Sequence, residues 1–71
     1  MILISDDHEK IIRDPRRIIM QKLEGRDLYI IKVDGSVFGY YWSHKTALAE
    51  MQNISDMMTT NKTYQVHSSD E

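Results

Sequence analysis

The sequence contains no cysteine, one proline, three glycines and no long apolar run. Without cysteine, disulfide bonds, thiolate metal ligands and thiol catalysis are all excluded. No apolar run approaches the roughly 20 residues that a membrane-spanning helix needs. The apolar start Met1–Ile4 passes at once into the polar, acidic segment 5–9, so it is too short and wrongly flanked for a signal peptide. We therefore expect a cytoplasmic protein that does not enter a membrane.

A chain of 71 residues has material for one hydrophobic core. We expect a single α+β domain over residues 1–67 and a disordered polar tail over residues 68–71. A domain this small buries only about 60% of the surface that its unfolded chain exposes. Small folds compensate for this limited burial with disulfide bonds, a metal or self-association. This chain has no cysteine for a disulfide bond and only three histidines as nitrogen ligands for a metal. The composition thus favours a homodimer.

The formal net charge is −2, but the charges are unevenly distributed along the chain. Residues 13–26 carry five basic against two acidic side chains, whereas residues 27–71 carry three basic against six acidic ones. The negative net charge argues against general binding to nucleic acid, while the basic segment leaves a specific anionic partner open.

The centre of the chain predicts a β-hairpin. Segments 28–33 and 37–42 are rich in β-branched and aromatic residues, which favour strands. Between them lies Asp34-Gly35, a pair suited to a two-residue turn because glycine accepts a positive φ at little cost. We expect the tip of the hairpin at Val33–Ser36, with Gly35 at positive φ.

The length of the turn decides which side chains share a face of this hairpin. With a two-residue turn, Tyr29 faces Tyr40 and Ile31 faces Phe38 across the strands. With a three-residue turn, the register shifts and one strand presents its other face. In either register both faces are apolar, so one face is free for the protein's own helices and the other for a partner.

Two helices are predicted, one on each side of the hairpin. After it, Ser43 is a good N-cap, and the following segment carries apolar residues at spacings of three and four. These residues are Ala47, Leu48, Met51, Ile54 and Met58. The helix is expected to stop at Asn61, and residues 63–67 alternate like a short final strand.

Before the hairpin, Asp14-Pro15 has the pattern of a helix start, with aspartate as the cap and proline in the first turn. The buried side of this helix would consist of Ile18, Ile19 and Leu23. The helix would stop at Gly25. Further upstream, Asp6-x-x-Glu9 has the spacing of a capping box, which predicts a helical turn through residues 11–12 before a kink at the proline.

In chain order these elements give β-α-β-β-α-β, the split-βαβ or ferredoxin-like arrangement, if Met1–Ile4 forms a strand. If it does not, a reduced α-β-β-α-β order results. Either fold is an α+β protein with a small antiparallel sheet and helices on one face.

The aromatic residues of the hairpin region form the first candidate binding site: Tyr29, Phe38, Tyr40, Tyr41 and Trp42. The segment Gly35-Ser36-Val37-Phe38-Gly39-Tyr40-Tyr41 resembles the main aromatic motif of the RNA-recognition-motif family, without that motif's leading basic residue. The resemblance implies a sheet on which bases of single-stranded RNA stack. The alternative is that these rings form core and dimer surface.

Two pairs of cations form the second candidate site. Arg16 and Arg17 lie at one predicted helix start, and His44 and Lys45 lie at the other. In a split-βαβ fold both helices begin at the same edge of the sheet, so these side chains and the two N-termini would hold a phosphate or carboxylate together. The alternative is a solvated basic surface, because a cation at a helix N-terminus costs only a few tenths of a kcal/mol.

Nothing in the sequence indicates a metal centre, a cofactor or an active site. His8, His44 and His67 are scattered, and no two of them have the helical spacing typical of zinc ligands. The sequence contains no glycine-rich phosphate loop, nucleophile elbow or catalytic carboxylate motif. We therefore expect no enzymatic activity, no metal and no cofactor.

The function that we expect from these patterns is that of a small, non-catalytic protein-binding or regulatory module, acting as a homodimer on an unidentified protein partner. Small, acidic, cysteine-free chains are common among phage and mobile-element accessory proteins, which act on host factors. The alternative function is binding of single-stranded nucleic acid or a nucleotide through the aromatic sheet and Arg16 and Arg17.

Overall fold

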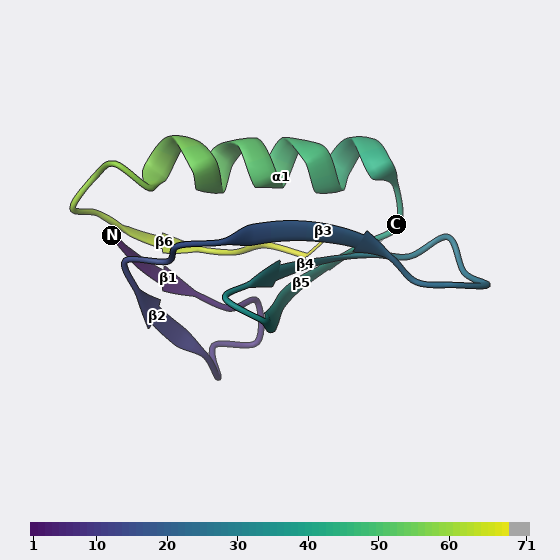
Figure 1. Cartoon of the computed structure of the whole chain (residues 1–71), viewed down its shortest axis with the longest axis horizontal. Helices are drawn as coiled ribbons and strands as arrows, with labels where there is room; N and C mark the ends of the chain where they lie inside the picture. The colour runs from purple at the N-terminus through teal and green to yellow at the C-terminus, as the bar shows by residue number, and fades with distance from the viewer. Residues whose placement is uncertain (69–71) are drawn as a thin grey trace.

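The computed structural model describes residues 1–68, which contain six strands and one helix. In chain order these are β1 (Ile2–Ile4), β2 (Ile11–Arg13), β3 (Ile18–Lys22), β4 (Tyr29–Val33), β5 (Ser36–Tyr41), α1 (His44–Met57) and β6 (Thr63–Gln65). Figure 1 shows α1 running along the long axis of the molecule, with the strands beneath it.

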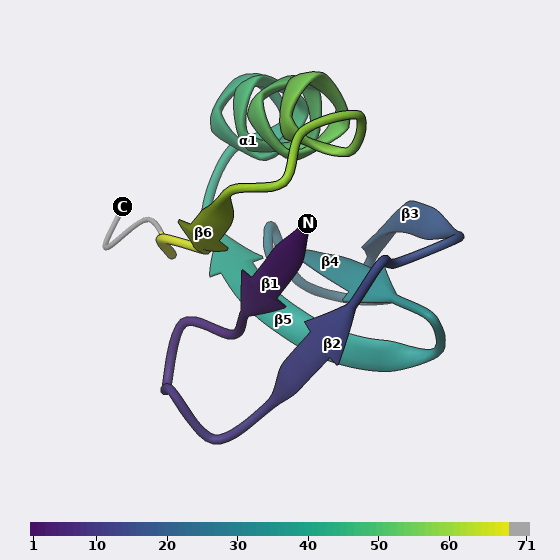
Figure 2. The same cartoon turned by 90° about the vertical axis from the view of Figure 1, so that its left-hand side faces the viewer.

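The strands form two three-stranded sheets. In the first sheet, β1 lies between β2, which is antiparallel to it, and β6, which is parallel to it. In the second sheet, β4 lies between β3 and β5, and both pairs are antiparallel. The sheets meet where the Asp6 N–H donates to the Phe38 carbonyl at 2.9 Å. Figure 2 shows β6 and β1 on one side of the molecule and β3 on the other, with α1 above.

This order contradicts the predicted fold. Both the ferredoxin-like order and the reduced α-β-β-α-β order need a helix before the hairpin, but residues 14–25 contain β3, and the observed order is β-β-β-β-β-α-β. The β-branched Ile18 and Ile19 find a partner strand in β4 and pair with it in the antiparallel sense. Proline disfavours the right-handed helical conformation for the residue before it. Asp14, which precedes Pro15, accordingly has a φ of 52°, outside the helical region.

The predicted helical turn at residues 11–12 is also wrong, because these residues belong to β2. The polar segment before them forms the connection from β1 to β2. The buried Ser5 hydroxyl donates to Asp7 Oδ1 at 2.5 Å and accepts the Lys10 N–H at 3.0 Å. The hydrogen bonds from Ser5 and from the Glu9 N–H lower the pKa of Asp7. The residues with capping-box spacing thus stabilise a turn between strands.

The predicted hairpin tip is confirmed. Val33 pairs with Ser36, which leaves Asp34 and Gly35 as a two-residue turn. Their φ angles of 50° and 87° are both positive, as a type I′ turn requires. The open question of Met1–Ile4 is also answered, because Ile2–Ile4 is strand β1.

The hairpin register, which the sequence left open, follows the two-residue turn at the tip and then shifts. The ladder shifts at Phe38, which is the extra residue of a β-bulge in β5. Tyr29 therefore faces Tyr41 instead of Tyr40, and Ile31 faces the residue that follows the bulge. The bulge turns Tyr41 toward the core and Tyr40 away from it.

Helix α1 begins as predicted. The Ser43 hydroxyl accepts the Thr46 N–H at 3.1 Å, which is a typical N-cap. The helix ends before Asn61, which does not have the predicted left-handed φ. Leu48 is 52% exposed and lies outside the buried stripe, where Glu50 is found instead.

One cluster of buried apolar side chains lies between α1 and the two sheets. Its fully buried members include Leu3, Ile31, Val33, Phe38, Tyr41, Ile54 and Val66. Each side chain of this kind contributes about 1.5–3 kcal/mol when it leaves water. The core therefore draws on both sheets and on the helix.

Within residues 1–68 no helix is both long enough and apolar enough to cross a membrane. Residues 69–71 of the predicted polar tail lie outside the described residues. The hydroxyl of Ser68, the first residue of that tail, accepts the Tyr40 N–H at 2.9 Å and donates to Asp6.

Candidate binding surface

The five aromatic residues that the sequence suggested as a binding platform lie in three different places. Phe38 and Tyr41 are buried in the core and present no ring to a partner. Tyr29 is half-buried and packs against the start of α1. Tyr40 and Trp42 are 45% and 48% exposed. Of the five rings, these two are open to a partner.

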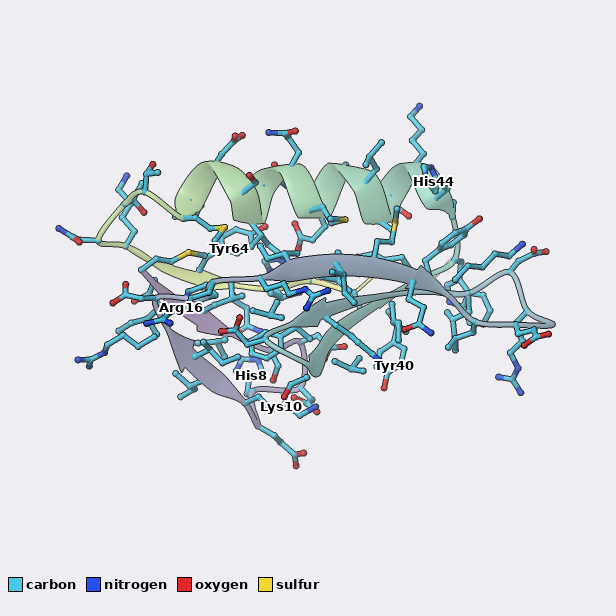
Figure 3. All side chains as sticks on the ribbon, in the orientation of Figure 1. His8, Lys10, Arg16, Tyr40, His44 and Tyr64 are labelled. Atoms are coloured by element: carbon cyan, nitrogen blue, oxygen red, sulfur yellow. The ribbon has the colours of Figure 1, made fainter. Side chains whose placement is uncertain are left out.

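Tyr40 projects from the side of the β3–β4–β5 sheet that faces away from α1 (Figure 3). It lies opposite Ile30 in β4. Trp42 lies one residue past the end of β5, and we infer from strand alternation that it is on the same side. Leu28 and Ile30 are buried but do not belong to the core cluster, so neighbours on this side cover them. We call this side the outer face; its residues are Ile19, Gln21, Leu28, Ile30, Lys32, Val37, Tyr40 and Trp42.

The outer face is mainly apolar. Ile19 is 37% exposed and adds to the area presented by the two rings. Lys32 supplies the full charge among the residues that define the face, and strand alternation places Arg17, one residue before β3, on the same side. At its margin, Lys10 Nζ donates to the Val37 carbonyl at 3.0 Å. Two half-exposed rings among mainly apolar side chains have the composition of the centre of a protein interface.

The predicted arginine pair lies beside the turn of the hairpin. The backbone N–H groups of Arg16 and Arg17 donate to Asp34 Oδ1 at 3.1 and 2.9 Å. This carboxylate connects the start of β3 to the hairpin tip through the two backbone N–H groups, and within residues 1–68 it forms no ion pair with either guanidinium group.

The other predicted pair, His44 and Lys45, lies at the start of α1 and at the opposite end of the sheet. The His44 ring meets the Tyr29 ring edge-on, with centroids 5.6 Å apart and an interplanar angle of 74°. Figure 3 shows His44 and Arg16 widely separated along the molecule. The two pairs therefore do not share an anion site. Arg16 and Arg17 precede strand β3, so only His44 and Lys45 lie at a helix N-terminus among residues 1–68.

The histidines are also dispersed. His8 lies between β1 and β2 with a φ of 63°, and His67 follows β6, where its ring lies 6.3 Å from that of Tyr64. Among residues 1–68 no three His, Asp or Glu side chains are grouped closely enough to hold a metal ion. No pocket opens on that part of the chain.

A buried polar cluster, absent from the predicted sites, fastens β6 to α1. Its centre is Glu50, which is 7% exposed. Glu50 Oε1 accepts from the Tyr64 hydroxyl at 2.6 Å and from the Asn53 amide at 3.2 Å. Its Oε2 accepts the His67 N–H at 2.8 Å. Buried acidic groups persist when their oxygens are hydrogen-bonded in this way.

The cluster raises the pKa values of two tyrosines. Burial, followed by the hydrogen bond to Glu50, raises the pKa of Tyr64 to about 12. Burial and the nearby charge of Glu50 raise the pKa of Tyr41 still further. The hydrogen bonds of Glu50 join α1 to Tyr64 in β6 and to His67 beyond it. We therefore assign this cluster to the stability of the fold.

A sequence signal for Glu50 was available. It follows Ala47 by three residues and precedes Ile54 by four, and both of these are fully buried. Helical periodicity alone therefore places its side chain on the buried stripe.

Comparisons of the chain with protein-family models, with curated proteins and with solved structures gave no match.

Proposed function

We propose that this protein is a small, non-catalytic binding module whose outer face docks onto an apolar surface of another protein. The observation that carries this proposal is the pair Tyr40 and Trp42, whose half-exposed rings lie at the end of β5. Tyrosine and tryptophan dominate the energetic centres of protein interfaces. Each offers a large, rigid contact area at a small cost in side-chain entropy.

The surroundings of the rings favour a protein over a single strand of nucleic acid as the partner. A nucleic-acid platform combines stacked rings with a basic track that follows the phosphates. Here Lys32 lies within the outer face and Lys10 at its margin, while Arg16 and Arg17 lie beside the hairpin turn, where their backbone N–H groups donate to Asp34. Two of the five predicted stacking rings are also in the core.

The cellular setting is the part of the proposal that rests on composition. The chain is small, acidic and free of cysteine, which suits the reducing cytoplasm. We propose that it acts there on a host factor, as an accessory protein of a phage or mobile element.

A comparative capture experiment tests the docking surface. Immobilised wild-type protein, the double variant Tyr40→Ser/Trp42→Ser and the variant Leu48→Ser are each exposed to lysate of the source cell, and bound proteins are identified by mass spectrometry. Leu48 is a matched control because it is an equally exposed apolar residue on α1, away from the outer face. We expect a partner that wild type and Leu48→Ser retain and that the double variant loses.

The affinity for the purified partner then measures the effect. Removal of two aromatic side chains at the centre of an interface should weaken binding by about 2 kcal/mol or more, which is roughly 30-fold. Circular dichroism of the three proteins confirms that they are folded. A partner bound equally by all three would refute the outer face as the docking surface.

A further inference from the structure

Strand β3 forms an edge of the molecule. It pairs with β4 on one side, and no described strand pairs with it on the other. Figure 2 shows β3 at the margin, on the side opposite β6. An edge strand presents unpaired N–H and C=O groups that another strand can bind.

The pairing with β4 decides which backbone groups of β3 are free. Two hydrogen bonds flank the ladder: Asp34 N–H to Arg17 O, and Leu23 N–H to Leu28 O, both at 2.9 Å. Because bonded residues alternate in an antiparallel ladder, the odd-numbered residues of β3 bond to β4. The residues whose backbone groups point out of the sheet edge are Ile18, Met20 and Lys22.

The middle of this edge lacks the features that protect most edge strands from pairing. Charged side chains, prolines and bulges are the usual protection. In β3 the first three residues are Ile18, Ile19 and Met20, and the single charge, Lys22, stands at the last position. At the edge of the other sheet, β2 has three residues and ends at Arg13.

We propose that a second copy of this chain pairs with β3, edge to edge and antiparallel, about a two-fold axis at Met20. In this register Met20 lies opposite Met20 of the second copy, and Ile18 lies opposite its Lys22. The register pairs the whole length of β3 and sets free backbone groups against free backbone groups, which gives about six new hydrogen bonds. The two β3–β4–β5 sheets then form one continuous sheet.

The charges just beyond the strand ends select the second copy as the occupant and support this register. Arg16 of one copy lies opposite Glu24 of the other, and the two-fold axis repeats the pair at the other end. Both side chains are exposed, and neither forms an ion pair among residues 1–68 of its own chain. Opposite charges facing each other across strands stabilise a sheet, whereas like charges destabilise it. A shift of two residues would separate the pairs and shorten the ladder.

The dimer would extend the docking surface. A two-fold axis normal to the sheet places both α1 helices on one side and both outer faces on the other. Ile19 and Gln21 of the two copies meet at the seam, between the two sets of Tyr40 and Trp42. The use of this enlarged surface rests on the proposed function, but the pairing of the β3 edges does not.

The mass of the intact chain in solution tests the pairing. Light scattering at micromolar concentration should give about twice the monomer mass of 8.4 kDa. Arg16→Glu sets acidic groups against each other at both ends of the seam and should raise the dissociation constant roughly tenfold. Glu24→Arg should do the same, and the combination Arg16→Glu/Glu24→Arg should restore the wild-type dimer.

A cross-link reads the register directly. The chain has no cysteine, so Met20→Cys places a single thiol on the two-fold axis. Mild oxidation should then give a covalent dimer. Ile11→Cys is the control, because this exposed residue lies on β2 and should form no covalent dimer under the same conditions.

Three results would overturn the pairing of the β3 edges. They are a monomer at micromolar concentration, a dimer that neither single charge reversal weakens, and equal cross-linking of the two cysteine variants. The Tyr40→Ser/Trp42→Ser variant separates this inference from the proposed function, because it should dimerise normally while losing the partner. If that variant is a monomer, the copies meet through their outer faces and the β3 proposal is wrong.

Discussion

Gly39 lies directly against the ring of Tyr41. A Cβ atom on Gly39 would be 2.5 Å from the Tyr41 Oη and 3.0 Å from two atoms of the ring. The ring occupies the space that a side chain at position 39 would need, so the buried position of Tyr41 depends on this glycine. The Tyr41 hydroxyl has no hydrogen-bond partner among residues 1–68, although it is buried.

Gly39→Ala should therefore destabilise the protein. The methyl group forces the Tyr41 ring out of its place, and such overpacking costs about 1–3 kcal/mol. Urea denaturation of wild type and variant measures the difference. Tyr41→Phe is the companion variant and should be neutral or stabilising, because it removes a buried hydroxyl without a partner. A clear loss of stability in Tyr41→Phe would mean that the hydroxyl is hydrogen-bonded after all.

Gly35→Val should lower the free energy of unfolding by about 1 kcal/mol or more, because a β-branched residue resists positive φ. Gly35 has a φ of 87°, and a Cβ at this position meets no atom within 4 Å, so the effect is one of backbone conformation. Gly35→Asn, which tolerates the left-handed region, should have a much smaller effect. Equal melting temperatures for the valine variant and wild type would contradict the turn.

Tyr64 and Glu50 should be energetically coupled. Tyr64→Phe removes one hydrogen bond and should cost about 1 kcal/mol. Glu50→Ala should lower the free energy of unfolding by more than Tyr64→Phe, because it also leaves the His67 N–H without its acceptor. A double-mutant cycle should give a coupling energy of about 0.5–3 kcal/mol, whereas simple additivity of the two losses would argue against the 2.6 Å hydrogen bond.

Stability should decline at alkaline pH. Tyrosine in an unfolded chain loses its proton near pH 10, while the pKa of Tyr64 in the folded protein is raised to about 12. Between these values the folded state holds more protons than the unfolded state, so the free energy of unfolding is full below pH 10 and falls as the pH rises toward 12. Denaturation at several pH values should show a shallower decline for Tyr64→Phe than for wild type.

Oligonucleotide binding separates the proposed function from its alternative. We expect no binding of single-stranded RNA or DNA at low salt by fluorescence anisotropy. A nucleic-acid module would instead bind with an affinity that falls steeply with salt, because each neutralised phosphate releases counterions. In that case Arg16→Ala/Arg17→Ala would flatten the salt dependence, and Tyr40→Ala would weaken binding by about 1–3 kcal/mol. Such behaviour would favour the nucleic-acid reading over a protein partner.

The parts of the fold that local signals determine could be predicted from the sequence. Asp34-Gly35 needs two positive φ angles, which few residue pairs accept, and Ser43 followed by helical periodicity defines the start of α1. These signals act over a few residues and do not depend on the rest of the chain. They yielded the hairpin tip, the helix start and the strands on either side.

The parts that depend on distant partners were predicted wrongly. Asp14-Pro15 followed by Ile18 and Ile19 fits a helix start equally well in isolation, and the pairing with β4 decides the matter in favour of a strand. The bulge at Phe38 decides which residues of β5 face the core, and no local pattern in the sequence reveals it. The exposed pair Tyr40 and Trp42 could be separated from the other rings only after that register was known.

The parallel pairing of β1 with β6 joins segments that are about 60 residues apart in the sequence. Gln65 Nε2 donates to the Ser5 carbonyl at 2.6 Å across a separation of 60 residues, at the end of the β1–β6 pair. Closing so large a loop delays folding, because its entropy is lost before the contacts form. The hairpin and α1 form from contacts between residues close in sequence, but β1 keeps one side unpaired until β6 pairs with it. A truncation that removes β6 would thus expose Leu3 at the other end of the sequence, so damage at one end would be felt at the other.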